Sequence, residues 1–213
     1  METEVVSIVA RYVEEALGKE GFRYVCAVVA NCKMLALELE AQVDEVKSPE
    51  EIDTEALILA GYLHDISTIE HGFHDHHIKS AAMAVDVLCK LEMPAERISN
   101  VEQAILVHTT ALSPGQRSST SIEGRILYDA DKLGRLSGLA VVTSLIEFGA
   151  RYPSRAVTGD MLAAILRHIE ERFVELYQSL NTAPAREMAR EKFGNTLSFL
   201  DGVIEHLSDA TPV

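Results

Sequence analysis

The sequence predicts an all-α protein, a single-domain helical bundle of 213 residues. Apolar residues recur every three or four positions in nearly every segment, which is the spacing of amphipathic helices. No segment shows the apolar–polar alternation of a half-buried strand, and the connections are short. We therefore predict one domain over residues 1–213, with a motif-bearing core at about 22–150 and C-terminal helices at about 158–207.

Eight helices are expected, and each is marked by a periodic apolar face. In chain order they cover residues 3–17, 22–42, about 54–64, 76–91, 98–109, 121–150, 158–180 and 184–207. Gly18 is a natural stop for the first helix. Asp53 or Thr54 is expected to cap the third helix, and Ser121 the long sixth one. Gly134 or Gly138 is expected to loosen that long helix.

Two polar stretches are expected to be loops. Residues 43–52 are rich in charge and contain Pro49. Residues 110–120 combine proline, glycine and serine, and are the clearest flexible loop of the chain. Because no motif lies in the second loop or in the C-terminal helices, substrate selectivity is expected to reside there.

The charge balance excludes whole classes of partner. The formal net charge is −14 and the isoelectric point is near 4.9. Non-specific binding of nucleic acid or of an anionic membrane requires a basic surface, so neither is expected. A small phosphorylated ligand remains compatible, because a metal ion and a few local cations can reverse the field in one pocket. A homo-oligomer is also compatible with these features.

The predicted compartment is the cytoplasm. Cys26, Cys32 and Cys89 form no CxxC pair and lie in apolar helical patterns, so they are expected to be buried free thiols. The acidic N-terminus lacks the basic region of a secretion signal. No uncharged apolar run reaches the ~18 residues that a membrane span needs.

A histidine cluster is the strongest chemical signal. Five of the eight histidines fall between His64 and His77. Imidazoles and carboxylates that converge at a helix end are typical of sites for borderline divalent metals. The alternative is a solvated histidine-rich turn. It is disfavoured because His64 and Asp65 directly follow the apolar run 57–63, which should lie in the core.

Two further segments add potential ligands. His108 ends an apolar helix, where a hydrogen-bonded core histidine is the alternative explanation. Asp129 and Asp131 lie in the apolar helix around Ile126–Leu133. Burying a carboxylate is costly without a partner. Since these aspartates are about 200° apart around the helix, one can face a metal ion while the other faces elsewhere.

This order of motifs resembles the HD superfamily of metal-dependent phosphohydrolases, over roughly residues 22–150. The segments that carry the resemblance are Leu59–Ile66, Asp75–Ala81, Ala104–His108 and Ile126–Leu133. The last segment is similar to the branch of small prokaryotic HD hydrolases that includes nucleotide pyrophosphohydrolases. By this resemblance His64 and Asp65 match the HD doublet, Asp131 the late aspartate, and His76 or His77 together with His108 the auxiliary histidines.

One position departs from the family pattern. Where the first family histidine should lie, on the helix at 22–42, this chain has Tyr24, and no histidine precedes His64. A neutral phenol is a poor metal ligand, although a phenolate binds hard ions such as ferric iron. Three alternatives stay open: Tyr24 ligates the metal, water fills the gap, or the site is weakened.

The resemblance implies hydrolysis of a phosphate or diphosphate ester, with a nucleotide as substrate, by attack of a metal-bound water. One or two divalent ions are implied, drawn from Mn, Fe, Ni, Co, Zn and Mg. The implied catalytic residues are Asp65, His76 and His108, and the implied metal ligands are His64, Asp65, Asp131 and His77. Candidates for orienting the ligands are Asp129 and Glu70, and candidates for binding phosphate are Lys79, Lys132 and Arg135. Alternative functions are an HD-fold regulatory module that binds metal or nucleotide without turnover, and a purely structural helical protein.

Overall fold

The computed structural model describes residues 3–41, 51–110, 116, 119–136, 138–153 and 158–209. These residues form helices and turns and contain no strand, which confirms the all-α prediction. Most of the two predicted loops, 43–52 and 110–120, and the end of the C-terminal tail lie outside the described residues. The chain divides into two compact units, Met1–Asp131 and Lys132–Val213. The single-domain organisation therefore stays a prediction.

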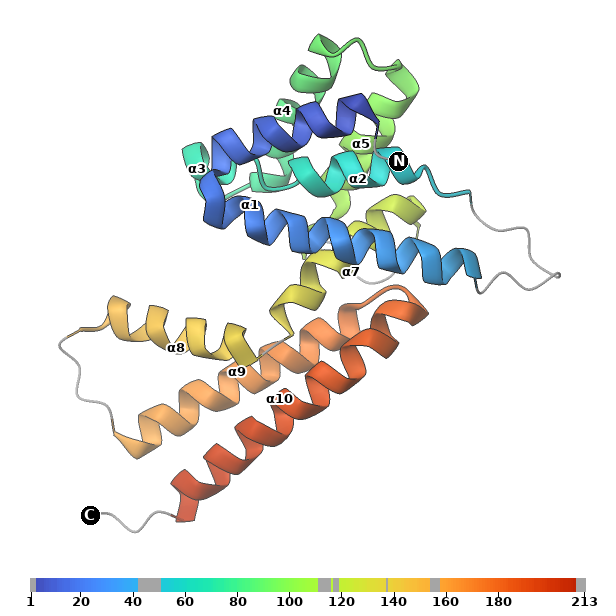
Figure 1. The fold of residues 1–213 in the computed structure, drawn as a ribbon. Coiled ribbons are helices and arrows are strands. Elements are labelled where there is room, and N and C mark those ends of the chain that lie inside the picture. The colour runs from blue at the N-terminus through green and yellow to red at the C-terminus, as the bar shows by residue number, and fades with distance from the viewer. Residues whose placement is uncertain are drawn as a thin grey trace. The chain divides into compact units, whose positions relative to one another are not determined.

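Helix α1 spans Glu4–Ala41 and bends sharply at Gly18. Gly18 has φ 68° and ψ 175°, a left-handed conformation that a residue without Cβ adopts at low cost. Figure 1 shows the two halves of α1 as blue rods that meet at this bend. The predicted break at Gly18 is confirmed, but the chain re-enters the helix directly instead of forming a separate connection. The second half supplies the apolar stripe from Val25 to Ala36.

Helix α2 spans Thr54–Leu63, and every residue from Ala56 to Leu63 is buried. Of the two predicted caps, Asp53 is the one that caps it: its side chain accepts a hydrogen bond from the Ala56 amide at 3.0 Å. At Gly61 a Cβ would lie 3.0 Å from Cγ2 of Val29, so glycine permits the close packing of α2 against α1. Because α2 is buried on all sides, the residues that directly follow it also lie in the core.

Four further helices complete the part of the first unit that the structure describes. They are α3 (Thr68–His71), α4 (His76–Lys90), α5 (Ala95–Val107) and the part of α7 (Ile122–Arg135) that ends at Asp131. Three of them start within a few residues of the predicted positions, whereas the short helix α3 was not predicted. Helix α4 packs against α5, and α5 also packs against α2. The Ser121 hydroxyl caps α7 by accepting from the Gly124 amide at 3.2 Å, as expected.

The second unit contains α8 (Gly138–Arg151), α9 (Gly159–Ser179) and α10 (Ala183–Asp209). Helices α9 and α10 pack side by side, with the rings of Tyr177 and Phe193 stacked at 4.5 Å (Figure 1). The prediction of one continuous helix over 121–150 was wrong, because α7 ends at Arg135 and α8 begins at Gly138. Gly138, one of the two glycines expected to loosen this helix, is the first residue of α8. In the part of the chain that the structure describes, every helix falls short of what crossing a membrane requires.

We expect Gly124→Ala to lower the free energy of unfolding by ~1–3 kcal/mol, the typical cost of overpacking a core. A Cβ at Gly124 would lie 2.4 Å from Cγ2 of Val107, a stiff β-branched side chain on α5. Urea denaturation followed by circular dichroism measures the change. The matched control is Gly149→Ala in α8, where a Cβ meets nothing within 4 Å. The Gly149→Ala substitution should leave the free energy of unfolding unchanged or raise it. Equal effects at both glycines would contradict the tight contact between α5 and α7.

The three cysteines differ in exposure, which corrects the expectation that all are buried. Cys32 is buried, Cys26 is half-buried and Cys89 is exposed, and all three are free thiols. Cys89 follows the buried Leu88, and one residue further along a helix turns the side chain by about 100°, here to the solvent face of α4. Burial, and secondarily the charge of Asp131, raises the pKa of the Cys32 thiol well above its usual range.

We therefore expect a thiol reagent at pH 8 to modify Cys89 rapidly in the native protein and to leave Cys32 unmodified until the protein unfolds. A raised pKa keeps Cys32 in the unreactive thiol form, and burial blocks access to it. Mass spectrometry after brief alkylation, with and without urea, measures the two rates. Rapid native labelling of Cys32 would contradict the buried contact between α1 and α2.

Candidate metal centre

His64 and Asp65 lie in the turn that follows α2, inside the core. His64 is 0% exposed and Asp65 is 7% exposed. The turn is closed by the Thr68 amide, which donates to the Asp65 carbonyl at 3.0 Å, and by the Thr68 hydroxyl, which donates to the same oxygen at 2.7 Å. The apolar sequence of α2 thus forces a buried imidazole and a buried carboxylate next to each other. Such a pair requires polar partners.

A buried serine pair ties the start of α4 to this turn. The Ser67 hydroxyl donates to the His76 carbonyl at 3.1 Å, and the Ser80 hydroxyl donates to Ser67 Oγ at 2.9 Å. The Ser67 amide also donates to Ser80 Oγ at 3.2 Å. These bonds fix the first residue of α4 against the turn after α2. His76 Nε2 consequently lies 3.5 Å from Asp65 Oδ1.

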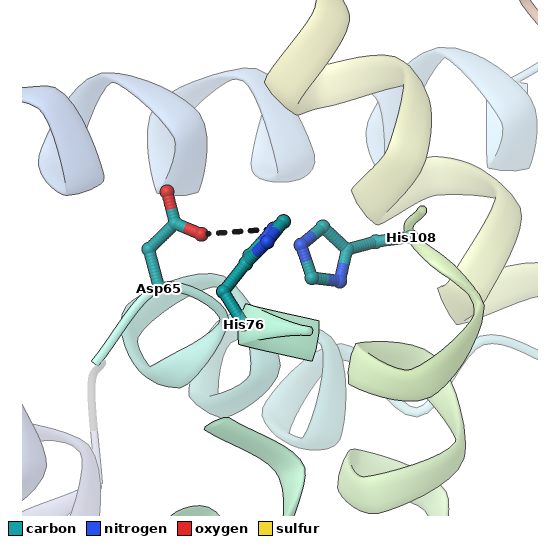
Figure 2. A group of neighbouring side chains, drawn as sticks. All are labelled: Asp65, His76 and His108. Atoms are coloured by element: carbon teal, nitrogen blue, oxygen red, sulfur yellow. Dashed lines mark ion pairs between the residues drawn. The ribbon is translucent and has the colours of Figure 1, made fainter. Parts of the chain in front are cut away.

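His108 completes the cluster from the end of α5. Its side chain is 1% exposed, and its ring centre lies 5.3 Å from that of His64 and 5.2 Å from that of His76. Figure 2 shows the side chains of Asp65, His76 and His108 gathered from three separate segments. The ligand atoms of these three residues all lie within 4.8 Å of one another. We refer to them as the metal triad.

The tautomers of three histidines follow from their hydrogen bonds. In each, the ring Nδ1 contacts the carbonyl three residues earlier, and a carbonyl can only accept, so Nδ1 carries the proton. The carbonyls belong to Gly61 for His64 (2.8 Å), Phe73 for His76 (2.8 Å) and Ile105 for His108. Nε2 of each neutral ring then keeps its lone pair for a ligand. An Nδ1 proton bound to a backbone carbonyl is the usual support of a metal-binding imidazole.

These residues fit a divalent cation. His64 Nε2 and Asp65 Oδ1 are buried and have no hydrogen-bond partner among the described residues, whereas buried polar atoms are normally bonded. Bonds of about 2.0–2.2 Å place two ligand atoms of one ion up to about 4.4 Å apart, close to the spacing of the metal triad. Imidazole nitrogen with carboxylate oxygen suits Zn, Mn, Fe, Co or Ni.

Tyr24 and Asp131 form a second polar pair beside the cluster. Asp131 is 1% exposed, and the Tyr24 hydroxyl donates a hydrogen bond to its Oδ1. The Tyr24 ring centre lies 6.5 Å from that of His64. Next to this pair, the Asn31 amide donates to the Ala130 carbonyl at 3.1 Å and anchors α1 to α7. The structure thus brings Asp131 to the region of His64 but not into the metal triad.

His77 lies at the edge of the cluster. Its ring centre is 5.8 Å from that of His76 and 6.5 Å from that of His108, and its side chain is half-buried. Burial lowers the pKa of His77, as does the charge of His76, while Asp75 opposes the shift. A lowered pKa keeps the imidazole neutral. His77 is not in the metal triad, so its predicted role as a ligand stays a prediction.

Glu70 does not orient a ligating imidazole, which corrects that expectation. It is exposed, and its carboxylate lies 3.8 Å from Nε2 of His71, itself 47% exposed. The reason is the one-turn helix α3, which has no buried residue and projects both side chains into solvent. His74 is likewise exposed and contacts Asp75 at 2.9 Å. His71 and His74 therefore lie outside the cluster.

The remaining predicted residues have different settings. Lys79 Nζ donates to the His74 carbonyl at 3.0 Å and so supports the loop before α4. Asp129 is fully buried on α7. Lys132 is 4% exposed and Arg135 is exposed, and both belong to the second unit. Roles in phosphate binding for these cations, and a ligand-orienting role for Asp129, stay predictions.

Sequence reasoning missed the serine pair and Asn31. Ser67 and Ser80 are small polar residues in buried positions, and only their pairing across thirteen residues reveals a positioning role. Asn31 lies on the stripe of α1 that faces α7. Its position on an otherwise apolar face was the available signal.

Comparison with known proteins supports the resemblance to the HD superfamily. The model of the HD domain matches residues 25–136. No curated protein matches the chain significantly. Among solved structures, Lin1889 of Listeria innocua is 18% identical with a TM-score of 0.68, and the match covers 98% of each chain. YpgQ of Bacillus subtilis, solved in complex with ADP, is 17% identical with a TM-score of 0.66, covering 95% of this chain and 94% of that one. A Lactobacillus plantarum protein is 16% identical with a TM-score of 0.71, covering 99% of this chain and 100% of that one.

Proposed function

Because the chain belongs to the HD-domain family, whose members are usually metal-dependent phosphohydrolases, we propose that it hydrolyses a phosphate or diphosphate ester of a nucleotide. The observation that carries the proposal is the metal triad. Three segments far apart in the sequence place Asp65, His76 and His108 with their ligand atoms within 4.8 Å of one another. Asp65 and His108 are buried and His76 is half-buried, and a cluster of this composition has no evident structural purpose without a cation.

Asp65 is the central residue of the proposed site. Its Oδ1 faces His76 and its Oδ2 lies 3.5 Å from Nε2 of His64, so one carboxylate connects the metal triad to His64. The ligands that we assign are Asp65, His76 and His108, with His64 beside them. When bound, a divalent ion supplies Lewis acidity toward phosphoryl oxygens and lowers the pKa of a bound water. The Nδ1 hydrogen bonds hold the three imidazoles so that their Nε2 atoms stay available.

A nucleotide is the proposed substrate for two reasons. The segment Ile126–Leu133 is similar to that of HD enzymes that hydrolyse nucleotides, and the structural neighbour YpgQ was solved in complex with ADP. The net charge of −14 disfavours an anionic ligand over most of the surface. Binding at this site therefore depends on the charge of the cation itself.

The test is a hydrolysis screen on metal-stripped protein reloaded with Mn²⁺, Co²⁺ or Ni²⁺. Nucleoside mono-, di- and triphosphates are offered separately, and released phosphate and pyrophosphate are measured. We expect release from at least one nucleotide class with at least one metal, and none in the presence of EDTA. Lack of release with every metal and nucleotide, from protein that binds the metal, would rule out the hydrolase.

A regulatory module is the second candidate, and Tyr24 favours it. The family pattern has a histidine at this position, and a neutral phenol is a weaker ligand, so catalysis could have been lost while binding persists. In that case a nucleotide raises the melting temperature of the metal-loaded protein by mass action, without any turnover. Thermal shift and product release, measured on the same preparation, separate the two candidates.

A further inference from the structure

We infer that Tyr24 holds Asp131 out of the metal coordination, so that the chain binds a single divalent ion at the metal triad. This inference rests on the proposed metal site and specifies how many ions it takes. It gives Tyr24 a positioning role, distinct from that of a metal ligand.

Asp131 is a carboxylate at 1% exposure, and such a charge needs a compensating partner. Two kinds of partner are available in this part of the fold, a cation or a hydrogen-bond donor. The structure shows the second kind: the Tyr24 hydroxyl donates to Asp131 Oδ1. Hydrogen bonds between an O–H group and a carboxylate are short and strong. Asp131 therefore has a strong hydrogen-bond donor that does not depend on a bound metal ion.

The position of Tyr24 explains why this bond competes with metal binding. Its ring lies 6.5 Å from that of His64, so the phenol reaches from the neighbourhood of His64 to the Asp131 carboxylate. His64 and Asp65 Oδ2 are 3.5 Å apart and would form the start of a second cation site, with Asp131 as its natural third ligand. Among the described residues, however, Asp131 does not join them in a group of three mutually close ligands.

The backbone around Asp131 is fixed by an independent contact. Asn31, two turns beyond Tyr24 on α1, donates to the Ala130 carbonyl at 3.1 Å. Both bonds join the same two helices, so two hydrogen bonds between α1 and α7 hold Asp131 next to Tyr24. Moving Oδ1 of Asp131 toward His64 requires breaking the phenol bond. With that bond intact, Oδ1 of Asp131 is held by the phenol and is withheld from the site beside His64.

The test counts Mn²⁺ ions by isothermal titration calorimetry and elemental analysis, which do not depend on turnover. We expect the wild-type protein to bind a single Mn²⁺, and Asp131→Asn to bind it with affinity unchanged within about twofold, whereas Tyr24→Phe should gain a second Mn²⁺. Removing the hydroxyl frees the Asp131 carboxylate to join His64 and Asp65. The matched control is Tyr12→Phe, which deletes a hydroxyl from a half-buried position on the first half of α1 and should leave the stoichiometry unchanged.

Three outcomes would overturn the inference. One is a loss of Mn²⁺ binding in Asp131→Asn, which would make Asp131 a ligand. Another is a folded Tyr24→Phe variant that still binds a single ion. The third is a visible charge-transfer band in the Fe³⁺-loaded protein that Tyr24→Phe lacks, which would make Tyr24 a phenolate ligand. Asp131→Asn keeps an oxygen that accepts from Tyr24, so it tests the inference even if Tyr24→Phe does not fold. Normal ion counts with no hydrolysis would count against the hydrolase alone.

Discussion

Asp65→Asn is expected to abolish high-affinity binding of Mn²⁺ and to lower nucleotide hydrolysis by roughly 10³-fold or more. The change removes the only carboxylate of the metal triad, while the amide keeps the size of the side chain. A catalytic cation contributes several kcal/mol to the stabilisation of the transition state. Each 1.36 kcal/mol lost corresponds to about a tenfold lower rate. Calorimetric titration and the initial rate of phosphate release measure the two effects.

The control for this variant is Asp86→Asn, which removes one negative charge from the exposed face of α4. It tests whether a change of net charge alone accounts for the loss, and it should leave binding and rate unchanged. Circular dichroism establishes that Asp65→Asn is folded. A folded Asp65→Asn protein that binds Mn²⁺ as tightly as the wild type would remove Asp65, and with it the metal triad, from the site.

The fold class and the position of the candidate site were predictable because both depend on local patterns. The apolar run before His64 predicts a buried helix end, and the structure confirms this with eight consecutive buried residues from Ala56 to Leu63. His76 at the start of one helix and His108 at the end of another were likewise predictable from helix boundaries. Asp65, His76 and His108 each lie at or next to the end of a helix that has buried apolar residues. Polar side chains in such positions indicated that they could form a cluster.

Contacts between distant segments were not predictable in the same way. Glu70 lies between Asp65 and His76 in the sequence, yet α3 has no buried residue and leaves Glu70 in solvent. Cys89 illustrates the same limit, because a shift of one residue on α4 decides between core and surface. Tyr24 was located as the position that departs from the family pattern, but its bond to Asp131 spans 107 residues and depends on how α1 meets α7.

The choice between His76 and His77 shows how geometry resolves what spacing leaves open. Both residues begin α4, and adjacent helix positions differ by about 100° in direction. The Ser67 hydroxyl bonds the carbonyl of His76, and the Nε2 of His76 lies 3.5 Å from Asp65. The ring centre of His77 lies 6.5 Å from that of His108, compared with 5.2 Å for His76. Asp65 and Ser67 therefore both favour His76 as the ligand.

We accordingly expect His76→Gln to weaken Mn²⁺ binding by at least ~100-fold, beyond the 10–100-fold loss typical of a residue that only supports a ligand. His77→Gln, the neighbouring change of identical chemistry, should weaken it by less than about tenfold. His71→Gln on the exposed α3 is the background control and should have no effect. Competition titration against a metal-sensitive dye resolves all three affinities on one scale. A larger loss in His77→Gln than in His76→Gln would reverse the assignment, and α4 would then present its second residue, not its first, to Asp65.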